Sequence, residues 1–300
     1  MENKKKVFLI LDCNSILHRA YHALPPLSTK KGVEIGAVYG FCLVFLKIIK
    51  EFKPDFIAAA FDYPSLTFRH REFKEYKIKR PKAPKEFYFQ IDITKKILKA
   101  FKVPIFEKEG FEADDIIGTI VKETERRQVF PPIENIIVSG DLDTLQLVSK
   151  KTKVFLLGKG IKKSILFDEE KVKEKYEGLV PLQLEDYKAL RGDVSDNIPG
   201  VRGIGEKTAK FLIKEFGSLE NLYKCIEKKE EKKVKEKLRK ILLEYKEQAF
   251  FSKKLAKIKK DVPIKFSLRE CAFGNYEKEE ILRIFKKLEF YSLIKKFKNG

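Results

Sequence analysis

Three apolar runs that each lead to an aspartate constrain the fold of this chain more than any other feature. Asp12 follows residues 7–11, Asp62 follows residues 56–61, and Asp141 follows residues 136–140. Short apolar runs of this kind are typical of buried strands in a parallel sheet. Ligands of open α/β sheets bind where the carboxyl ends of such strands meet. We therefore expect the three aspartates to line one pocket.

The segments between these runs predict the remaining architecture. Residues 37–52 are apolar with a helical period, so the first 62 residues predict a strand–helix–strand crossover unit. Further helices are expected at 86–101, 114–128, 168–176 and 181–190, with strands at 103–106 and 133–138 and a hairpin at 153–167. The expected fold class is α/β, with a mostly parallel central sheet flanked by helices.

An acidic trio, Glu112, Asp114 and Asp115, stands at the start of the helix expected from residue 114. Asp143 adds a second carboxylate two residues after Asp141. Helix capping explains one acid at each of these places, but it does not explain three acids together. Oxygen ligands alone favour Mg²⁺ or Mn²⁺ over zinc. The sequence thus predicts a carboxylate pocket for divalent metal ions.

The net charge narrows the choice of partners. The 300 residues contain 64 Lys and Arg against 44 Asp and Glu, a net charge of +20. Such an excess favours a polyanion, either nucleic acid or an anionic membrane surface. Because no run approaches the roughly 18 apolar residues of a membrane span, we expect no membrane association and a cytoplasmic protein.

A strongly basic segment follows Asp62. Eight Lys and Arg but only two acids occur between residues 69 and 85, with Phe68, Phe73 and Tyr76 interleaved. We interpret residues 66–90 as a basic arch over the pocket that contacts phosphates and stacks on bases. Pro81 divides it into short pieces. The alternative is a solvated basic helix.

A second informative block covers residues 191–209. Asp193 and Asp196 stand three apart, and a glycine-rich hairpin follows them. A helix expected near Glu206, with Lys207 in its first turn, offers free backbone N–H groups that bind phosphate without reading sequence. A plain packing loop between two helices is the alternative. Lys/Glu-rich amphipathic helices at 219–260 and two short helices at 278–297 complete the chain.

Taken together, these motifs resemble the 5′-nuclease family, closest to the N-terminal 5′–3′ exonuclease domain of bacterial DNA polymerase I and its stand-alone relatives. The resemblance is carried by Leu11-Asp12 through Pro26, by Phe61-Asp62 with Phe68-Arg69, by Glu75 to Pro81, by Gly110 to Asp115, by Ser139 to Asp143, and by Gly192 to Ala209. It implies a PIN-like or resolvase-like nuclease core at 1–180 with a helical arch. A helical DNA-binding domain is implied at 181–300, with a helix-hairpin-helix element at about 191–215.

The same resemblance implies roles for individual residues. The expected metal ligands are Asp12, Asp62, Glu112, Asp114, Asp115, Asp141, Asp143, Asp193 and Asp196. The expected catalytic residues are Asp12, Asp62, Lys77, Arg80 and Asp141. The expected DNA contacts are Arg69, Tyr76, Lys77, Arg80, Gly200, Arg202, Gly203, Gly205, Lys207 and Thr208. A monovalent cation, K⁺, is implied beside Ser195.

The implied activity is two-metal-ion hydrolysis of DNA near 5′ ends or flaps, as a 5′–3′ exonuclease or flap endonuclease in replication and repair. The products would be a 5′-phosphate and a 3′-hydroxyl. We expect a monomer whose partner is DNA carrying 5′ ends or flaps, with a DNA polymerase acting in trans. Two alternatives stand beside this: a PIN-type ribonuclease, and a non-catalytic protein that binds duplex DNA.

Overall fold

A six-stranded sheet forms the centre of the molecule. The computed structural model describes residues 5–127, 130–158, 164–228 and 234–298. The strand order is β3-β2-β1-β4-β5-β6, with β6 antiparallel to β5 and the other neighbours parallel. The strands are β1 Lys6–Asp12, β2 Phe56–Ala60, β3 Ile105–Phe106, β4 Ile133–Ser139, β5 Thr152–Leu157 and β6 Ser164–Phe167. The predicted α/β fold with a mostly parallel sheet is confirmed. Most of the hairpin tip expected near residue 160 lies outside the described residues.

Strand β1 is the point from which the sheet grows in two directions. It pairs with β2 on one side and with β4 on the other, all three parallel. Its residues Phe8 to Leu11 are fully buried, because helices cover both faces of the sheet. Ligands of such sheets bind at the carboxyl ends of the strands where the order reverses. A ligand is therefore expected near the ends of β1 and β4, where the strand order reverses.

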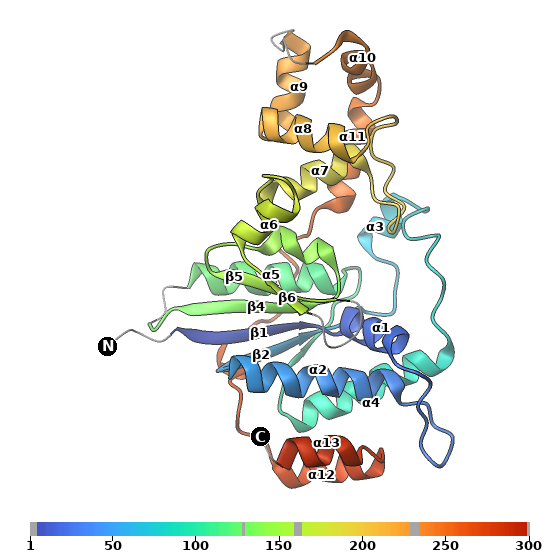
Figure 1. Cartoon of the computed structure of the whole chain (residues 1–300), viewed down its shortest axis with the longest axis vertical. Coiled ribbons are helices and arrows are strands. Elements are labelled where there is room, and N and C mark those ends of the chain that lie inside the picture. Colours follow the sequence, from blue (N-terminus) through green and yellow to red (C-terminus); the bar gives the residue numbers. More distant parts are fainter. Residues whose placement is uncertain (1–4, 128–129, 159–163, 229–233, 299–300) are drawn as a thin grey trace.

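Helices cover the two faces of this sheet separately (Figure 1). Helices α1 (Cys13–Ala23), α2 (Gly36–Phe52) and α4 (Lys85–Ala100) pack on one face. Helix α5 (Ala113–Arg126) packs on the other. Helix α2 ends where Lys53 takes a left-handed conformation, φ 45°, and Pro54 cannot extend the helix. In the described part of the chain, no helix is both long and apolar enough to cross a membrane.

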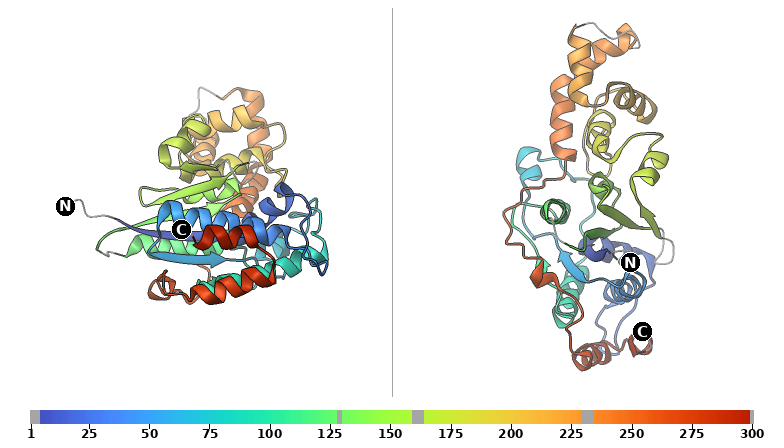
Figure 2. Two further views of the ribbon diagram at one scale, coloured as in Figure 1. Left: turned by 60° about the horizontal axis from the view of Figure 1, so that its bottom comes forward. Right: turned by 90° about the vertical axis from the view of Figure 1, so that its left-hand side faces the viewer.

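A group of helices stands at one end of the molecule (Figure 2). It comprises α6 Glu169–Lys175, η2 Pro181–Gln183, α7 Leu184–Arg191, α8 Glu206–Phe216, α9 Leu219–Lys228, α10 Glu236–Glu244 and α11 Lys246–Ala256. Apolar side chains of α7, α8 and α9 continue the core that α5 forms with the sheet. The helical part is therefore joined to the sheet by packing as well as by the chain.

The chain then returns to the sheet. A strap, residues 257–262, leads past α5 to η3 (Arg269–Cys271) and to α12 (Lys278–Lys287) and α13 (Tyr291–Lys298). These last two helices pack beneath α2 and α4, where Phe290 lies 5.3 Å from Tyr39 and Phe297 lies 5.8 Å from Phe101, ring centroid to ring centroid. The range 181–300 thus does not pack as one unit, since its end belongs to the opposite side of the molecule.

The basic arch contains less helix than expected. Its first part forms the short helix α3, Phe68–Glu72, and residues 73–84 run through turns without a helix until α4 begins at Lys85. Pro81 and Pro84 remove backbone donors in this stretch, which explains why α4 begins only after them. Three turns in succession bring this stretch over the edge of the sheet where β1 and β2 end.

Gly118 sets how closely α5 approaches the strap. A Cβ atom at this position would lie 2.7 Å from the Lys259 carbonyl oxygen and 2.8 Å from Ile258 Cγ2. Gly118→Ala should therefore lower the free energy of unfolding by about 1–3 kcal/mol, although alanine favours helix by about 1 kcal/mol. Chemical denaturation measures this. Gly36→Ala is the matched control, because its added Cβ meets no atom closer than 3.6 Å; equal stability of both variants would contradict the close packing.

Candidate metal centre

The carboxyl edge of the sheet gathers aspartates from three strands. Asp12 ends β1, Asp62 follows β2 by two residues, and Asp141 follows β4 by two residues. Asp62 also accepts a hydrogen bond from the Ala113 backbone N–H at 2.8 Å, which ties it to the start of α5. The three predicted positions therefore meet at one edge, beside the acidic N-terminus of α5.

Asp12 is held in place by β4 and α1. Its two carboxylate oxygens accept hydrogen bonds from Ser139 Oγ at 2.6 Å and from the Ser15 N–H at 3.2 Å. Burial raises the pKa of Asp12 to about 7, and the negative charges of Asp141 and Asp62 add to the effect. Hydrogen bonds thus position the Asp12 carboxylate, and within the described residues it has no ion pair with a lysine or arginine.

Burial raises the pKa values of other acids at this edge as well. Burial, with Glu112 nearby, raises the pKa of Asp62. Burial and the neighbouring Asp115 raise the pKa of Asp114 well above its usual range, and Asp114 Oδ1 is buried without a hydrogen-bond donor. Burial also raises the pKa of Asp143 to about 6. Buried carboxylates of this kind ionise readily when a cation shares their space.

Basic side chains of the arch reach the same edge. Lys77 Nζ lies 2.5 Å from Glu112 Oε2 and 3.9 Å from Asp196 Oδ2, and Arg80 Nη2 lies 2.5 Å from Asp196 Oδ1. Burial opposes ionisation of Glu112, but Lys77 and Arg69 outweigh it and lower the pKa of Glu112 to about 2. The Lys77 N–H also donates to the Asp196 carbonyl at 2.9 Å. The arch therefore joins the acids of α5 to the loop after α7.

Lys188 makes a second bridge between the sheet and the helical part. Its ammonium group pairs with Asp143 and lies 2.6 Å from Asp193 Oδ2. Burial opposes ionisation of Asp193, but Lys188 and two hydrogen bonds from Ser195 outweigh it and lower its pKa to about 2. The hydroxyl of Ser195 donates to Asp193 Oδ1 at 2.6 Å. Lys188 thus connects Asp193 to Asp143 at the sheet edge, and Lys77 connects Asp196 to Glu112.

The residues suit divalent cations, although the basic groups now neutralise several acids. Within the described residues, no three His, Cys, Asp or Glu side chains converge closely enough to hold one ion. The acids instead pair with Lys77, Arg80 and Lys188. The Asp114 oxygen, which has no hydrogen-bond partner among the described residues, and the all-oxygen donor set nevertheless fit a divalent cation.

Asp115 and Arg69 have a different task from the one predicted. Arg69 is 1% exposed and forms two hydrogen bonds with the Asp115 carboxylate, at 2.7 and 2.8 Å. Asp115 also accepts from the Lys259 and Glu112 backbone N–H groups. Both oxygens of Asp115 are therefore engaged by donors, and Arg69 cannot reach a phosphate. The structure corrects the prediction that Arg69 contacts DNA and leaves Asp115 least suited to a metal ion.

Two other predicted DNA contacts are buried as well. Tyr76 is 3% exposed, and its hydroxyl shares its one proton between Glu112 Oε2 at 3.2 Å and Asp196 Oδ2 at 3.1 Å. Gly200 is buried, its N–H donates to Ser252 Oγ, and its carbonyl accepts from Gln248 Nε2. The predictions of DNA contact are therefore wrong for Tyr76 and Gly200 in this structure. Both residues hold other segments in place.

The tip of the glycine hairpin is open to a ligand. Gly203 has φ 83°, and a Cβ added there would meet no atom within 4 Å. Arg202, Gly205 and Lys207 are exposed around it, and α8 begins with Gly205 as its N-cap. The buried side chains of Val201 and Ile204 anchor the turn between them. This arrangement presents backbone N–H groups and positive charge at one helix N-terminus.

Comparison with known proteins decides the family. The profile "5′-3′ exonuclease, N-terminal resolvase-like domain" matches residues 7–177, and the profile "5′-3′ exonuclease, C-terminal SAM fold" matches residues 179–279. The chain belongs to the 5′–3′ exonuclease family. This assignment makes it a phosphodiesterase and accounts for both the sheet and the helical part.

Curated relatives of this 5′–3′ exonuclease domain are longer proteins. DNA polymerase I of Bacillus subtilis (strain 168) is 44% identical over 296 residues, which are 99% of this chain and 32% of that protein. DNA polymerase I of Bacillus caldotenax is 41% identical over 295 residues, 98% of this chain and 33% of that protein. The chain thus spans about a third of the length of the curated relatives that it matches.

Solved structures share the fold of the 5′–3′ exonuclease. The bacteriophage T5 D15 flap endonuclease, crystallised with DNA and metal ions, has a TM-score of 0.68 at 19% identity, covering 98% of this chain and 97% of that chain. The catalytic core of Rad2 in complex with DNA substrate has a TM-score of 0.60 at 16% identity, covering 98% of this chain and 90% of that chain.

Sequence reasoning missed the side chains that position the exonuclease acids. Lys188 lies in α7 among the buried Tyr187, Ala189 and Leu190. A lysine in such an apolar stretch indicates a buried charge that needs an acidic partner. Ser15 and Ser139 stand beside predicted acids, yet a serine in such a place carries no distinctive pattern. Arg19 Nη2 donates to the Gly140 carbonyl at 2.8 Å, a contact that joins parts of the chain 121 residues apart.

Breaking the Arg69–Asp115 pair should be costly. Arg69→Met should lower the free energy of unfolding by about 3–5 kcal/mol, because Asp115 would stay buried without its partner. Urea denaturation at neutral pH measures this. Arg71→Met is the matched control, since Arg71 is exposed, and it should change stability by less than about 0.5 kcal/mol. Equal decreases in the free energy of unfolding for the two variants would show that the buried pair does not contribute more to stability than an exposed arginine.

The raised pKa of Asp12 predicts a pH dependence. Between its ordinary value of 3.8 and about 7, the unfolded carboxyl is ionised while the folded one retains its proton. The contribution of Asp12 to stability is therefore full below pH 3.8 and is lost as pH rises through about 7. In EDTA, the stability of wild type relative to Asp12→Asn should fall between about pH 4 and 7. The exposed Asp92→Asn variant should show no such trend; a flat difference for Asp12 would refute the buried, uncompensated charge.

Proposed function

We propose that this chain is a structure-specific 5′–3′ exonuclease and flap endonuclease of DNA that uses two divalent metal ions, Mg²⁺ or Mn²⁺. The observation that carries the proposal is the convergence of Asp12, Asp62 and the acidic start of α5 on one sheet edge, beneath Lys77 and Arg80. The D15 flap endonuclease and Rad2 structures, both bound to DNA, support it through the shared fold.

The metal ligands that we propose are Asp12, Asp62, Glu112, Asp114, Asp141, Asp143, Asp193 and Asp196, with Asp115 as the weakest member. When bound, the ions would supply an activated water and neutralise charge on a phosphodiester. The chain's own residues would do the rest. Ser139 and Ser15 orient Asp12, and Lys188 holds Asp193 near Asp143 by pairing with both.

Lys77 and Arg80 are the residues that we propose to stabilise the reacting phosphate. Both extend from the arch to the acidic edge, and the side chain of Arg80 remains 47% exposed. A lysine and an arginine placed there can neutralise charge that develops on phosphate oxygens. The products would be a 5′-phosphate and a 3′-hydroxyl.

The proposed grip on duplex DNA lies at the hairpin tip. Arg202, Gly203, Gly205, Lys207 and Thr208 stand at the start of α8, where N–H groups and lysine charge suit a phosphate backbone. We further propose K⁺ beside Ser195, a monomeric state, a cytoplasmic location and a role in replication and repair with a polymerase in trans. Binding of this kind is independent of sequence and falls steeply with salt.

A cleavage assay tests the proposal. The protein is incubated with a labelled 5′-flap duplex or a matching RNA, with Mg²⁺ or with EDTA. We expect cleavage of the DNA with Mg²⁺ alone. Asp141→Asn should reduce cleavage at least about a hundredfold and preserve DNA binding, because asparagine still caps the turn after β4.

Asp92→Asn is the matched control, since it makes the same change at an exposed position of α4, and it should cleave normally. Preferential cleavage of the RNA would favour a PIN-type ribonuclease. Binding of DNA without cleavage by wild type would favour a non-catalytic binding protein. Full activity of Asp141→Asn would remove that residue from the catalytic site.

A further inference from the structure

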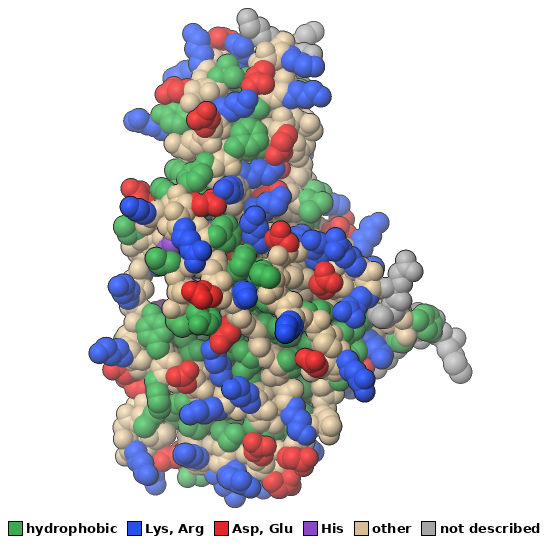
Figure 3. Space-filling view, turned by 180° about the vertical axis from the view of Figure 1, so that it is seen from behind, with side chains coloured by type: hydrophobic (Ala, Val, Ile, Leu, Met, Phe, Trp, Pro, Cys, Tyr) green, Lys and Arg blue, Asp and Glu red, His purple; other side chains and the backbone are tan. Residues whose placement is uncertain are grey.

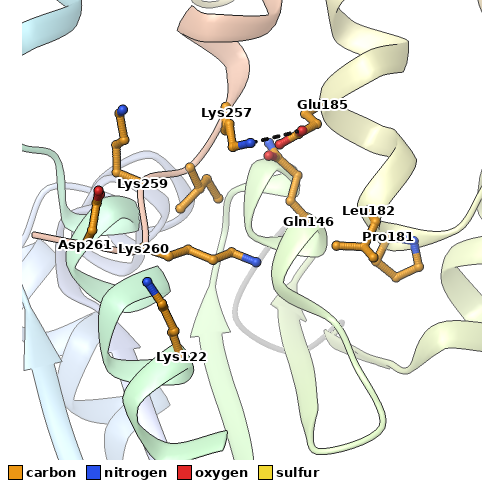
Figure 4. Close-up of a pocket in the computed structure, with 10 residues that line it drawn as sticks. Lys122, Gln146, Pro181, Leu182, Glu185, Lys257, Lys259, Lys260 and Asp261 are labelled. Carbon is orange, nitrogen blue, oxygen red and sulfur yellow. Dashed lines mark hydrogen bonds and ion pairs between the residues drawn. The ribbon is translucent and has the colours of Figure 1, made fainter. Parts of the chain in front are cut away.

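A cavity of about 400 Å³ lies between the sheet and the helical part, away from the acidic edge. It is lined by the strap, by α5, by η1 (Leu142–Leu147), by η2 and by the start of α7, and it is partly open to solvent. Lys122 of α5 and Lys260 of the strap both line it (Figure 4). Lys122 stands eight residues after Asp114 on the same helix, about 12 Å along its axis. The cavity is therefore separate from the proposed metal centre.

Two other lysines that line the cavity have partners within the protein. Lys257 Nζ donates to Glu185 Oε1 at 3.5 Å, and Lys259 Nζ lies 5.6 Å from the centroid of the Phe68 ring. Figure 4 shows Lys259 and Asp261 extending along the far side of the strap, whereas Lys122 and Lys260 extend towards the space between the elements. Within the described residues, neither of these two ammonium groups has an acidic partner.

We propose that this cavity binds phosphate groups, held between Lys122 and Lys260. Lys122 and Lys260 are both half-buried residues that line one cavity, so their like charges repel each other, whereas an anion between them attracts both. Lysine binds phosphate as a point charge. The apolar surface of Ile258 and the exposed Leu182 lies beside the pair and suits a sugar or a base. The phosphate can come from a DNA backbone or from a free nucleotide.

The cavity is connected to the metal centre through the strap. The Lys259 N–H donates to Asp115 Oδ1, and Arg69 at the base of the arch donates to the Lys257 carbonyl, both at 2.8 Å. A ligand that holds Lys260 therefore also fixes the strap against α5 and the arch. Lys and Arg are spread over both parts of the molecule on the face turned away from Figure 1 (Figure 3), so a DNA backbone has further positive charge to follow.

The test compares wild type with Lys122→Gln/Lys260→Gln. Calorimetry in EDTA measures binding of pyrophosphate, and fluorescence anisotropy measures binding of 5′-flap duplex DNA over a series of salt concentrations. The double variant should bind pyrophosphate at least about tenfold more weakly, or its DNA affinity should show a salt slope smaller by about two. Loss for pyrophosphate identifies a free nucleotide as the source, and loss for DNA identifies the backbone.

Lys286→Gln/Lys287→Gln is the matched control, because it removes the same charge from exposed positions of α12. It should bind both probes as wild type does. Unchanged binding of both probes by the cavity variant, or equal losses in the two double variants, would overturn the proposal. Only the DNA measurement rests on the proposed function. The pyrophosphate measurement does not, and cleavage of flap DNA, assayed separately, reports on the proposed function alone.

Discussion

The crowding of buried carboxylates at one sheet edge is the constraint on which the rest of this structure depends. Burial raises the pKa values of Asp12, Asp62, Asp114 and Asp143, so these groups need positive charge to ionise. Part of this positive charge comes from Lys77 and Arg80 of the arch and from Lys188 of α7, which are far apart in the sequence but form ion pairs with acids at the edge. These ion pairs thereby link the sheet edge, the arch and α7.

This arrangement also explains why the arch and the helical part are tied to the edge. Asp196 faces Lys77 and Arg80, while Asp193 faces Lys188. A metal ion that entered among these acids would compete with the ammonium groups for the same oxygens. The basic side chains would then become available to a phosphate. In this structure the ion pairs hold the arch and α7 beside the acids of the sheet edge.

Much of this could be predicted from local sequence. Strand-end aspartates and helical periodicity gave the sheet, its helices and the positions of Asp12, Asp62 and Asp141, because the period of side chains along a strand or helix is a local property. Roles that depend on distant partners could not be predicted. Arg69 looked like a phosphate contact in a basic run, but its partners Asp115, Leu255 and Lys257 come from elsewhere in the chain. Burial likewise reassigned Tyr76 and Gly200.

The guanidinium of Arg69 joins the arch, the first turn of α5 and the end of α11 with the strap, which is 188 residues away at Lys257. The surroundings of Arg69 are therefore completed only by the end of α11 and the strap, which the ribosome synthesises much later. A nascent chain that stopped before residue 255 would lack the Lys259 N–H that donates to Asp115 and the Leu255 and Lys257 carbonyls that accept from Arg69. Formation of the buried pair between Arg69 and Asp115 therefore depends on contacts between parts of the chain that are far apart in sequence.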